Sequence, residues 1–501
     1  MNIVVKKLIR VIISLNIIFI TEVTMASNSS SKETETEIEA KTEDYIATSK
    51  YYHNLISSND MAELNMFLSL LPKGGELHHH FSGAIYVENY LDLISKAGFY
   101  IDKNSYQVQK NKPNKTCLTV TALQDNYDLY TTILSHWSYG KFFYDHDYTQ
   151  EDGLKHFFNV FGYLAPIATV DVKSNLTLLK ARAKSENIQY IETILFPSPT
   201  SYNPALDKIN QLTSNTDDIT INDVLSQAVD VLDKDSIIQN EIAQNLREIV
   251  SNSQDIDEDD FSMRFQPYVI RFNKPSLIFS GLYSAFLMVK NNTKFVGVNI
   301  VGNEAHPIAL RDYKLHMKMF RFLKQKFPNV KLSLHAGELT LGQVTPEELS
   351  YHINDAVNVA GANRIGHGVD IMHESDPYQL INTLLNKNIL VEINLTSNEA
   401  LLGVQGNDHP VRLYMQYGVP IAISTDDLGV SRNNLTDEYL KFVTRYKPSY
   451  DKLKEIVSNS IKYSFLTEDE KTKQIDLLNK KFISFEDTIA SFVKKHSHVK
   501  K

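Results

Sequence analysis

Short apolar or alternating runs recur along the chain from about residue 71, and each run ends in a cluster of polar residues. Between the later runs, segments such as 311–326 and 377–385 carry apolar residues at three- and four-residue spacing, as amphipathic helices do. This alternation predicts a parallel sheet, and eight strands close most economically into a (β/α)8 TIM-type barrel of the α/β class. A doubly wound open sheet is the alternative. The strands are expected at residues 75–81, 188–196, 264–272, 294–301, 331–335, 364–369, 389–395 and 419–424.

Two stretches interrupt this repeat and are predicted to be insertions in the barrel. Residues 100–152 are rich in Tyr, Lys and Asn, and residues 206–262 contain helical patches at 224–232 and 237–250. An acidic run at residues 255–260 follows the second patch. We expect this run to be a solvated loop, because no histidine accompanies it.

The first 26 residues show the pattern of a signal peptide. Lys6, Lys7 and Arg10 precede an apolar run at residues 11–20, and small residues surround Met25 before an expected cleavage after Ala26. A residual membrane anchor is the alternative, but the run is shorter than the ~20 residues that a spanning helix needs. Residues 27–60 are expected to form an acidic polar leader and N-terminal extension, and residues 61–495 the barrel. We therefore expect an exported protein, secreted or periplasmic, with no stable membrane insertion after cleavage.

The charge and the cysteine content narrow the chemistry. The chain has 51 Lys and Arg against 60 Asp and Glu, a net charge of −9, which argues against a nucleic-acid partner and favours a small ligand. Signal cleavage would remove three basic residues and one acidic residue, so the mature charge becomes −11. Cys117 is the only cysteine, which excludes an intramolecular disulfide and a multi-cysteine metal site. A metal must therefore be held mainly by His, Asp or Glu.

The first predicted strand carries a run of three histidines, in the sequence Glu-Leu-His-His-His-Phe-Ser-Gly-Ala. Side chains two apart on a strand point to the same face, so His78 and His80 converge while His79 points away. Two imidazoles on one face can form half of a metal site. The alternative is a chance polar cluster.

Three further motifs lie at the ends of later predicted strands. His-Ala-Gly-Glu contributes His335 and Glu338, Arg-Ile-Gly-His-Gly contributes His367, and Ser-Thr-Asp-Asp contributes Asp426 and Asp427. Each motif alone has a structural explanation, such as a core histidine or a helix-capping pair. All four motifs end strands at the rim where barrel active sites are built, so the structural explanation would require four coincidences.

The order of these four motifs resembles the adenosine deaminase family of zinc-dependent aminohydrolases, over about residues 71–438. The Pro-Lys-Gly-Gly sequence before the first motif and the export signal are most similar to the secreted adenosine deaminase and growth-factor branch. The resemblance implies one Zn²⁺ per chain. It also implies hydrolytic deamination of adenosine, and of 2′-deoxyadenosine, to inosine and ammonia. The implied zinc ligands are His78, His80, His335 and Asp426.

The resemblance also implies roles for the other rim residues. His367 would orient and deprotonate the water, so that a zinc-bound hydroxide attacks C6 of the purine. Glu338 would protonate N1, Asp427 would hydrogen-bond N7, and the backbone amide of Gly302 would bind the purine. Where the family often has an acidic residue near the sugar, this chain has Ser82, which puts the preference among adenosine, deoxyadenosine and adenine in doubt.

Several alternatives remain at this point. A deaminase of adenine or of another modified purine nucleoside would fit the same residues, as would a metal hydrolase that cleaves an amide or ester on the same barrel. Against a binuclear hydrolase, no suitable lysine occurs near residues 295–304. A secreted signalling ligand with residual catalysis is a rival from another class. In the branch that this chain resembles, the receptor-binding insertion is held by a disulfide, which this chain cannot form. That branch also implies a homodimer.

Overall fold

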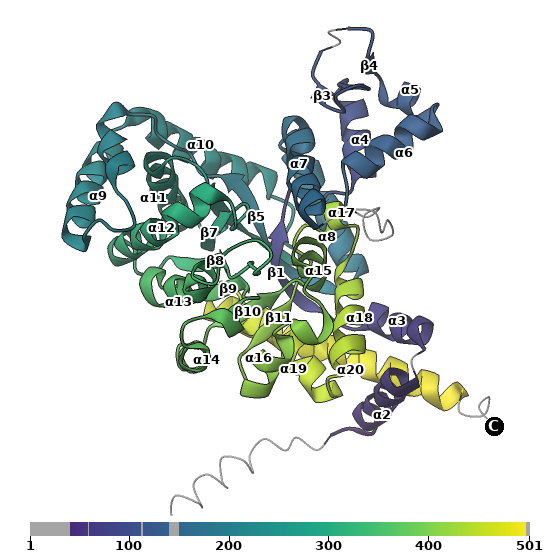
Figure 1. Ribbon diagram of the computed structural model, residues 1–501. Helices are drawn as coiled ribbons and strands as arrows, with labels where there is room; N and C mark the ends of the chain where they lie inside the picture. The colour runs from purple at the N-terminus through teal and green to yellow at the C-terminus, as the bar shows by residue number, and fades with distance from the viewer. Residues whose placement is uncertain (1–40, 59, 112–113, 140–149, 497–501) are drawn as a thin grey trace, which may run out of the picture. The chain divides into compact units, whose positions relative to one another are not determined.

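Eight parallel strands form the central sheet of the computed structural model, in the order β1-β5-β6-β7-β8-β9-β10-β11 (Figure 1). An isolated bridge between His79 and Asp426 joins the first strand to the segment after the last one, and the His80 N–H donates to the Asp426 carbonyl at 3.1 Å. The predicted (β/α)8 TIM-type barrel is therefore confirmed. The strands are β1 (Gly74–His80), β5 (Ile188–Pro197), β6 (Ser262–Ile270), β7 (Gly297–Val301), β8 (Lys331–Ala336), β9 (Arg364–His367), β10 (Leu390–Ile393) and β11 (Ile421–Ile423).

Each of the eight predicted runs overlaps one of these strands, with bounds that differ by up to three residues at the start of the strand. The fourth run was expected from residue 294, but β7 begins at Gly297, and Phe295 makes only a lone bridge with Phe265. A buried ion-paired group lies inside the barrel, where Arg364 contacts Glu192 and Glu392 at 2.6 Å each. These contacts fix the carboxylate of Glu392, a residue of β10, in the barrel interior.

The structure describes residues 41–58, 60–111, 114–139 and 150–496, so the predicted signal peptide lies outside the described residues. The chain divides into two compact units, residues 1–51 with 483–501, and residues 52–482. In the smaller unit the Thr48 hydroxyl donates to the Glu486 carbonyl at 3.2 Å, and the rings of Tyr51 and Phe492 are 6.2 Å apart. The predicted domain bounds stay predictions. The helices that contribute to this unit are α2 (Glu43–Ser58) and α20 (Glu468–His496).

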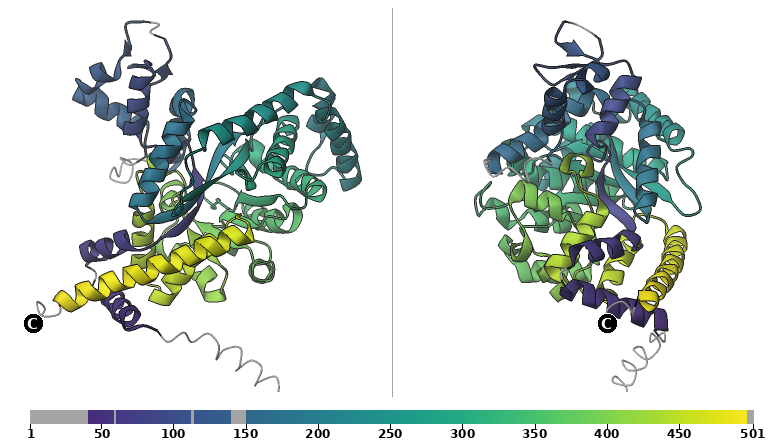
Figure 2. Two further views of the ribbon diagram at one scale, coloured as in Figure 1. Left: turned by 180° about the vertical axis from the view of Figure 1, so that it is seen from behind. Right: turned by 90° about the vertical axis from the view of Figure 1, so that its right-hand side faces the viewer.

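Helices lie outside the strands, as the two views in Figure 2 show. Three of the helices that follow strands, α11 (Pro275–Asn291), α12 (Pro307–Lys326) and α14 (Pro377–Asn386), begin with proline, because the first helical turn needs no N–H partner. No helix among the described residues combines the length and the apolar character needed to cross a membrane. Outside the two insertions, the other described helices are α3 (Met61–Leu70), α4 (Val87–Lys96), α8 (Val172–Ser185), α13 (His352–Asp355), α15 (Leu395–Leu402), α16 (Val411–Tyr417), α17 (Leu428–Ser431), α18 (Leu435–Tyr446), α19 (Tyr450–Lys462), η3 (Glu348–Ser350), η4 (Ala356–Ala360), η5 (Ile371–His373) and η6 (Gly406–Asp408).

Both predicted insertions contain secondary structure. The first holds a small antiparallel sheet, β2 (Tyr100–Asp102), β3 (Val108–Gln109) and β4 (Cys117–Leu118), followed by α5 (Val120–Gln124), α6 (Tyr127–His136) and α7 (Gln150–Ala168). The second holds η2 (Pro204–Gln211), α9 (Asp218–Leu232) and α10 (Ser236–Asn252).

The acidic run after α10 is a loop with mostly exposed acidic side chains, as expected, and basic side chains pair with it at the surface. Glu258 contacts Lys180 and Lys184 at 2.6 Å each, and Asp257 contacts Arg264 at 2.8 Å. The run therefore attaches the second insertion to α8 and to the start of β6. It is a structural feature and not a separate site.

Candidate metal centre and active site

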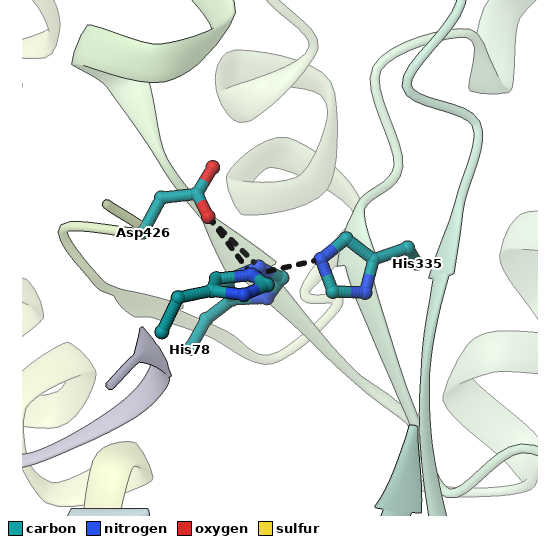
Figure 3. Close-up of side chains that lie close together, drawn as sticks. His78, His335 and Asp426 are labelled. Atoms are coloured by element: carbon teal, nitrogen blue, oxygen red, sulfur yellow. Dashed lines mark hydrogen bonds and ion pairs between the residues drawn. The ribbon is translucent and has the colours of Figure 1, made fainter. Parts of the chain in front are cut away.

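Four of the predicted site residues converge at the carboxyl ends of the strands. His78 and His80 come from β1, His335 comes from β8, and Asp426 follows β11; one ligating atom of each lies within 4.8 Å of the others. His80 Nε2 is 3.1 Å from His335 Nε2 and 3.2 Å from Asp426 Oδ1. Figure 3 shows the Asp426 carboxylate directed at His78 from one side, with His335 on the other. These residues share one site, as the sequence predicted.

The dimensions of this cluster fit a small tetrahedral ion. A tetrahedron with bonds of ~2.0 Å has ligand atoms about 3.3 Å apart, and the contacts given above are 3.1 and 3.2 Å. His78 Nε2 is buried, lies 3.4 Å from Asp426 Oδ1, and makes no hydrogen bond among the described residues. Three imidazoles and one carboxylate are ligands that zinc accepts. The residues present therefore fit a zinc ion.

The outer nitrogens of two of these imidazoles are held by buried side chains that the sequence analysis missed. His78 Nδ1 is 2.8 Å from Glu392 of β10, and His335 Nδ1 is 2.8 Å from Asn299 of β7. Burial raises the pKa of Glu392, but Arg364 and His78 outweigh it and hold the pKa at about 2. Such outer partners fix the ring orientation of a metal ligand. The sequence held a usable signal for Glu392, because an acidic residue stands within the apolar sequence Leu-Val-Glu-Ile. It held no such signal for Asn299.

Unusual backbone conformations occur at two site residues. Asp426 has φ +64° and His367 has φ +70°, a left-handed region that costs a non-glycine residue about 1–3 kcal/mol. At Asp426 the bridge to β1 enforces this conformation, because the Asp426 N–H also donates to the His78 carbonyl at 3.1 Å. The strained backbone turns the Asp426 carboxylate toward the imidazoles.

Glu338 lies on the loop after β8, beside the metal cluster. Its Oε1 is buried, makes no hydrogen bond among the described residues, and is 3.4 Å from His367 Nδ1. Burial, and then the charge of Asp426, raises the pKa of Glu338 well above its ordinary value. This shift favours the protonated carboxyl, which is the form able to donate a proton.

His367 ends β9, and its ring lies beside the cluster of candidate metal ligands. Its Nε2 is 3.8 Å from Asp426 Oδ2, and its Nδ1 is 2.9 Å from the amide of Asn398. Burial lowers the pKa of His367 to about 3, so the imidazole is neutral. The Asn398 atom next to Nδ1 is the amide nitrogen, and the amide oxygen is 3.0 Å from His409 Nε2. For Nε2 to accept a proton, Nδ1 must carry the hydrogen, so the Asn398 amide must rotate to bring its oxygen to Nδ1. His367 thus has the position of a base.

Asp427 follows the ligand Asp426 and is also buried. Its Oδ1 makes no hydrogen bond among the described residues. Burial raises the pKa of Asp427 to about 8; His80 opposes this shift and the Asp426 charge adds to it. The carboxyl depends on Gly83 for space, because a Cβ at Gly83 would lie 1.6 Å from Asp427 Oδ1. Gly83 is a site residue that the sequence analysis did not name, although it lies in the first motif.

The two remaining predicted residues lie at the same rim. Ser82 is half-buried in the turn after β1, and its carbonyl accepts a hydrogen bond from Tyr90 at 2.8 Å. Gly302 follows β7 with φ +99°, and a Cβ there would lie 2.7 Å from the ring of Phe272. This position needs glycine for both its backbone conformation and its space. The substrate contacts assigned to Ser82 and Gly302 stay predictions.

A barrel with a histidine and aspartate cluster at its carboxyl rim defines a class of metal-site proteins, and sequence comparison identifies the family. The family model described as adenosine deaminase matches residues 146–481, more than half of the chain. This chain belongs to the adenosine deaminase family. The matched region includes His335, Glu338 and Asp426, whereas His78 and His80 precede it.

Individual relatives match in part. An adenosine deaminase of Enterococcus faecalis is 32% identical over 192 residues, which are 38% of this chain and 50% of that protein. The chain thus spans about half the length of this relative. The structure of the Arabidopsis N6-mAMP deaminase is similar with a TM-score of 0.55 and 17% identity, over 83% of this chain and 99% of that chain. An amidohydrolase from Burkholderia ambifaria with bound Zn has a TM-score of 0.51 and 16% identity, over 86% and 95%. At these identities the two structures show the fold alone.

Proposed function

We propose that this protein is a zinc-dependent purine deaminase that converts adenosine, and 2′-deoxyadenosine, to inosine and ammonia. The observation that carries this proposal is the convergence of His78, His80, His335 and Asp426 beside the buried carboxyl of Glu338, whose pKa is raised. The membership of the chain in the adenosine deaminase family supports the reaction, and the zinc-containing amidohydrolase of the same fold supports the metal.

The metal and the neighbouring residues divide the chemistry between them. Bound zinc would lower the pKa of a coordinated water to about 7 and so supply a nucleophile at neutral pH. His367 is placed to take a proton from the water that adds to C6 of the purine, and Glu338 is placed to give its proton to N1. His367 then returns its proton to the amino group, which leaves as ammonia, and Glu338 recovers a proton from the new hydroxyl. The ring is left as inosine.

Three residues are proposed to hold the substrate. N7 of a purine accepts hydrogen bonds, so Asp427, whose pKa is about 8, donates its proton to N7 at neutral pH. The backbone amide of Gly302 binds the base edge, and the hydroxyl of Ser82 binds the sugar. A hydroxyl is a weaker partner for a sugar than a carboxylate is. A preference for adenine or for a modified purine nucleoside is therefore the second candidate.

The cellular setting is a separate proposal. The basic and apolar residues 1–26 support export through a signal peptide, with cleavage after Ala26. The resemblance to the secreted growth-factor branch supports a homodimer. Determination of the N-terminal residue of the mature protein tests the first statement, and light scattering of that protein tests the second.

A substrate panel tests the activity. Protein with one zinc per chain is assayed with adenosine, deoxyadenosine, adenine, AMP and N6-methyl-AMP, by the absorbance change of the adenine ring and by ammonia release. We expect adenosine to have the highest kcat/KM. A folded, zinc-loaded protein that leaves all five compounds unchanged would contradict the proposal. A kcat/KM for adenine above that for adenosine would favour the second candidate.

A further inference from the structure

A buried carboxylate that the proposed reaction does not use lies between two loops of the site. Glu304 is 2% exposed and follows β7, two residues after Gly302. Its Oε1 accepts the N–H of Gly337 at 3.2 Å, and its Oε2 accepts the N–H of Glu338 at 3.1 Å. The side chain of Glu304 therefore connects the loop after β7 to the loop after β8.

A histidine and an arginine lie next to this carboxylate. His352 Nδ1 is 2.6 Å from Glu304 Oε1, and a guanidinium nitrogen of Arg271 is 3.5 Å from Glu304 Oε2. The same Arg271 donates to the carbonyl of His335 at 3.0 Å and to that of Ile300 at 3.3 Å. Burial raises the pKa of Glu304, but Arg271 and then His352 outweigh it, so the carboxylate stays ionised. An ionised carboxylate binds backbone N–H groups more strongly than a neutral acceptor does.

The carboxyl of Glu338 has few other constraints. Its Oε1 makes no hydrogen bond among the described residues, so the side chain depends on its backbone for its position. That backbone begins at Gly337, which has φ +75°, and its two successive N–H groups point to Glu304. Without the two hydrogen bonds to Glu304, the loop backbone would not fix the orientation of Glu338.

We propose that Glu304 is a positioning residue for the deamination, and that it acts through the backbone of Gly337 and Glu338. It sets the spacing between the loop that holds the purine, at Gly302, and the loop that carries the proton donor. This inference rests on the proposed function, because it assigns Glu338 the transfer of a proton to the base. In this proposal Glu304 does not contact the substrate, and it does not contact the side chains of the metal ligands.

The test compares Glu304→Gln with a matched control. Glutamine keeps the shape but replaces one acceptor oxygen with an NH₂ group, which faces a donor and cannot bind it. The control is Glu374→Gln, since Glu374 is also buried and also accepts two successive backbone N–H groups, those of Ile353 at 2.6 Å and Asn354 at 3.0 Å. Neither of those two residues has been placed in the site.

Two readouts separate positioning from folding. We expect Glu304→Gln to lower kcat about 10²-fold, since a misplacement of about 1 Å is enough for this loss, while KM changes less than about threefold. Zinc content should remain at one per chain. Hydrogen exchange, measured by mass spectrometry on zinc-loaded protein, should become faster at Gly337 and Glu338. Glu374→Gln should lose thermal stability but keep kcat within about threefold of the wild type.

The outcomes decide between the alternatives. The proposal is overturned if Glu304→Gln keeps its kcat, or if Glu374→Gln loses as much as Glu304→Gln does. If Glu304→Gln fails to fold, Glu304→Asp replaces it: the charge remains but the carboxylate no longer reaches both amides, and kcat should fall about 10-fold. If the wild type deaminates no purine, the proposed function fails, and unchanged exchange at Gly337 and Glu338 would overturn the positioning role independently.

Discussion

The site has two halves at one rim. The metal half consists of the candidate ligands His78, His80, His335 and Asp426, and the proton-transfer half consists of Glu338, His367 and Asp427. The surroundings of the two halves differ. In the metal half, the outer nitrogens of His78 and His335 are hydrogen-bonded by Glu392 and Asn299 at 2.8 Å. In the proton-transfer half, buried oxygens of Glu338 and Asp427 make no hydrogen bond among the described residues. In the metal half, side chains orient the imidazoles of His78 and His335, whereas backbone and close packing position the carboxyls of Glu338 and Asp427.

The difference has an energetic meaning. A buried polar atom without a partner costs about 1–3 kcal/mol, so a protein retains such atoms only where something else requires them. At Glu338 and Asp427 burial raises the pKa, which favours the protonated carboxyl that is able to donate a proton. At His78 and Asp426 the closely spaced nitrogen and oxygen atoms instead fit a bound cation. The comparison therefore predicts that the two halves can be damaged separately.

The largest separate effect is expected at Glu338. Glu338→Gln removes the proton that N1 receives but leaves all four ligands in place, so kcat should fall about 10³-fold with one zinc still bound. Kinetics together with metal analysis by mass spectrometry measures both quantities. Near-normal turnover of this variant would show that another group donates the proton. Loss of zinc together with activity would show that the two halves are not separable.

A smaller loss is expected when space is removed beside Asp427. In Gly83→Ala the new Cβ would lie 1.6 Å from Asp427 Oδ1, so the carboxyl must move away from the position assigned to N7. We expect kcat/KM to fall about 10²-fold with zinc retained. Gly162→Ala in α7 is the control, because a Cβ there meets no atom within 4 Å. Equal activity of both variants would remove Asp427 from substrate binding.

The sequence predicted the barrel and the convergence of the ligands because both depend on local patterns. Eight apolar runs ending in polar clusters mark the strands, and a strand of period two is enough to bring His78 and His80 to one face. Parallel strands then place His335 and Asp426 at the same rim without further information. Motif identity, strand order and rim position were therefore readable before the structure.

The orienting residues were not readable in this way. Asn299 lies within β7, and Arg271 and Glu304 follow strands, all as ordinary polar residues. Their partners His335 and Gly337 lie more than 30 residues away along the chain. Which side chain faces an imidazole nitrogen or a loop amide depends on the relative rotation of neighbouring strands. The same limit applies to the acidic run at residues 255–260, whose basic partners on α8 could not be assigned from composition.

The smallest predicted effect perturbs the metal half alone. Asn299→Ala removes the partner of His335 Nδ1 but no ligand, so the zinc affinity should fall about 10- to 100-fold, as measured by competition with a chelator. At saturating zinc, kcat should stay within about threefold of the wild type, since the proton-transfer half is unchanged. Asn459→Ala is the matched control, because Asn459 is also buried but donates to the Ile421 carbonyl at the opposite end of β11. If Asn299→Ala lost activity that added zinc did not restore, the orientation of His335 would serve the reaction as well as the metal.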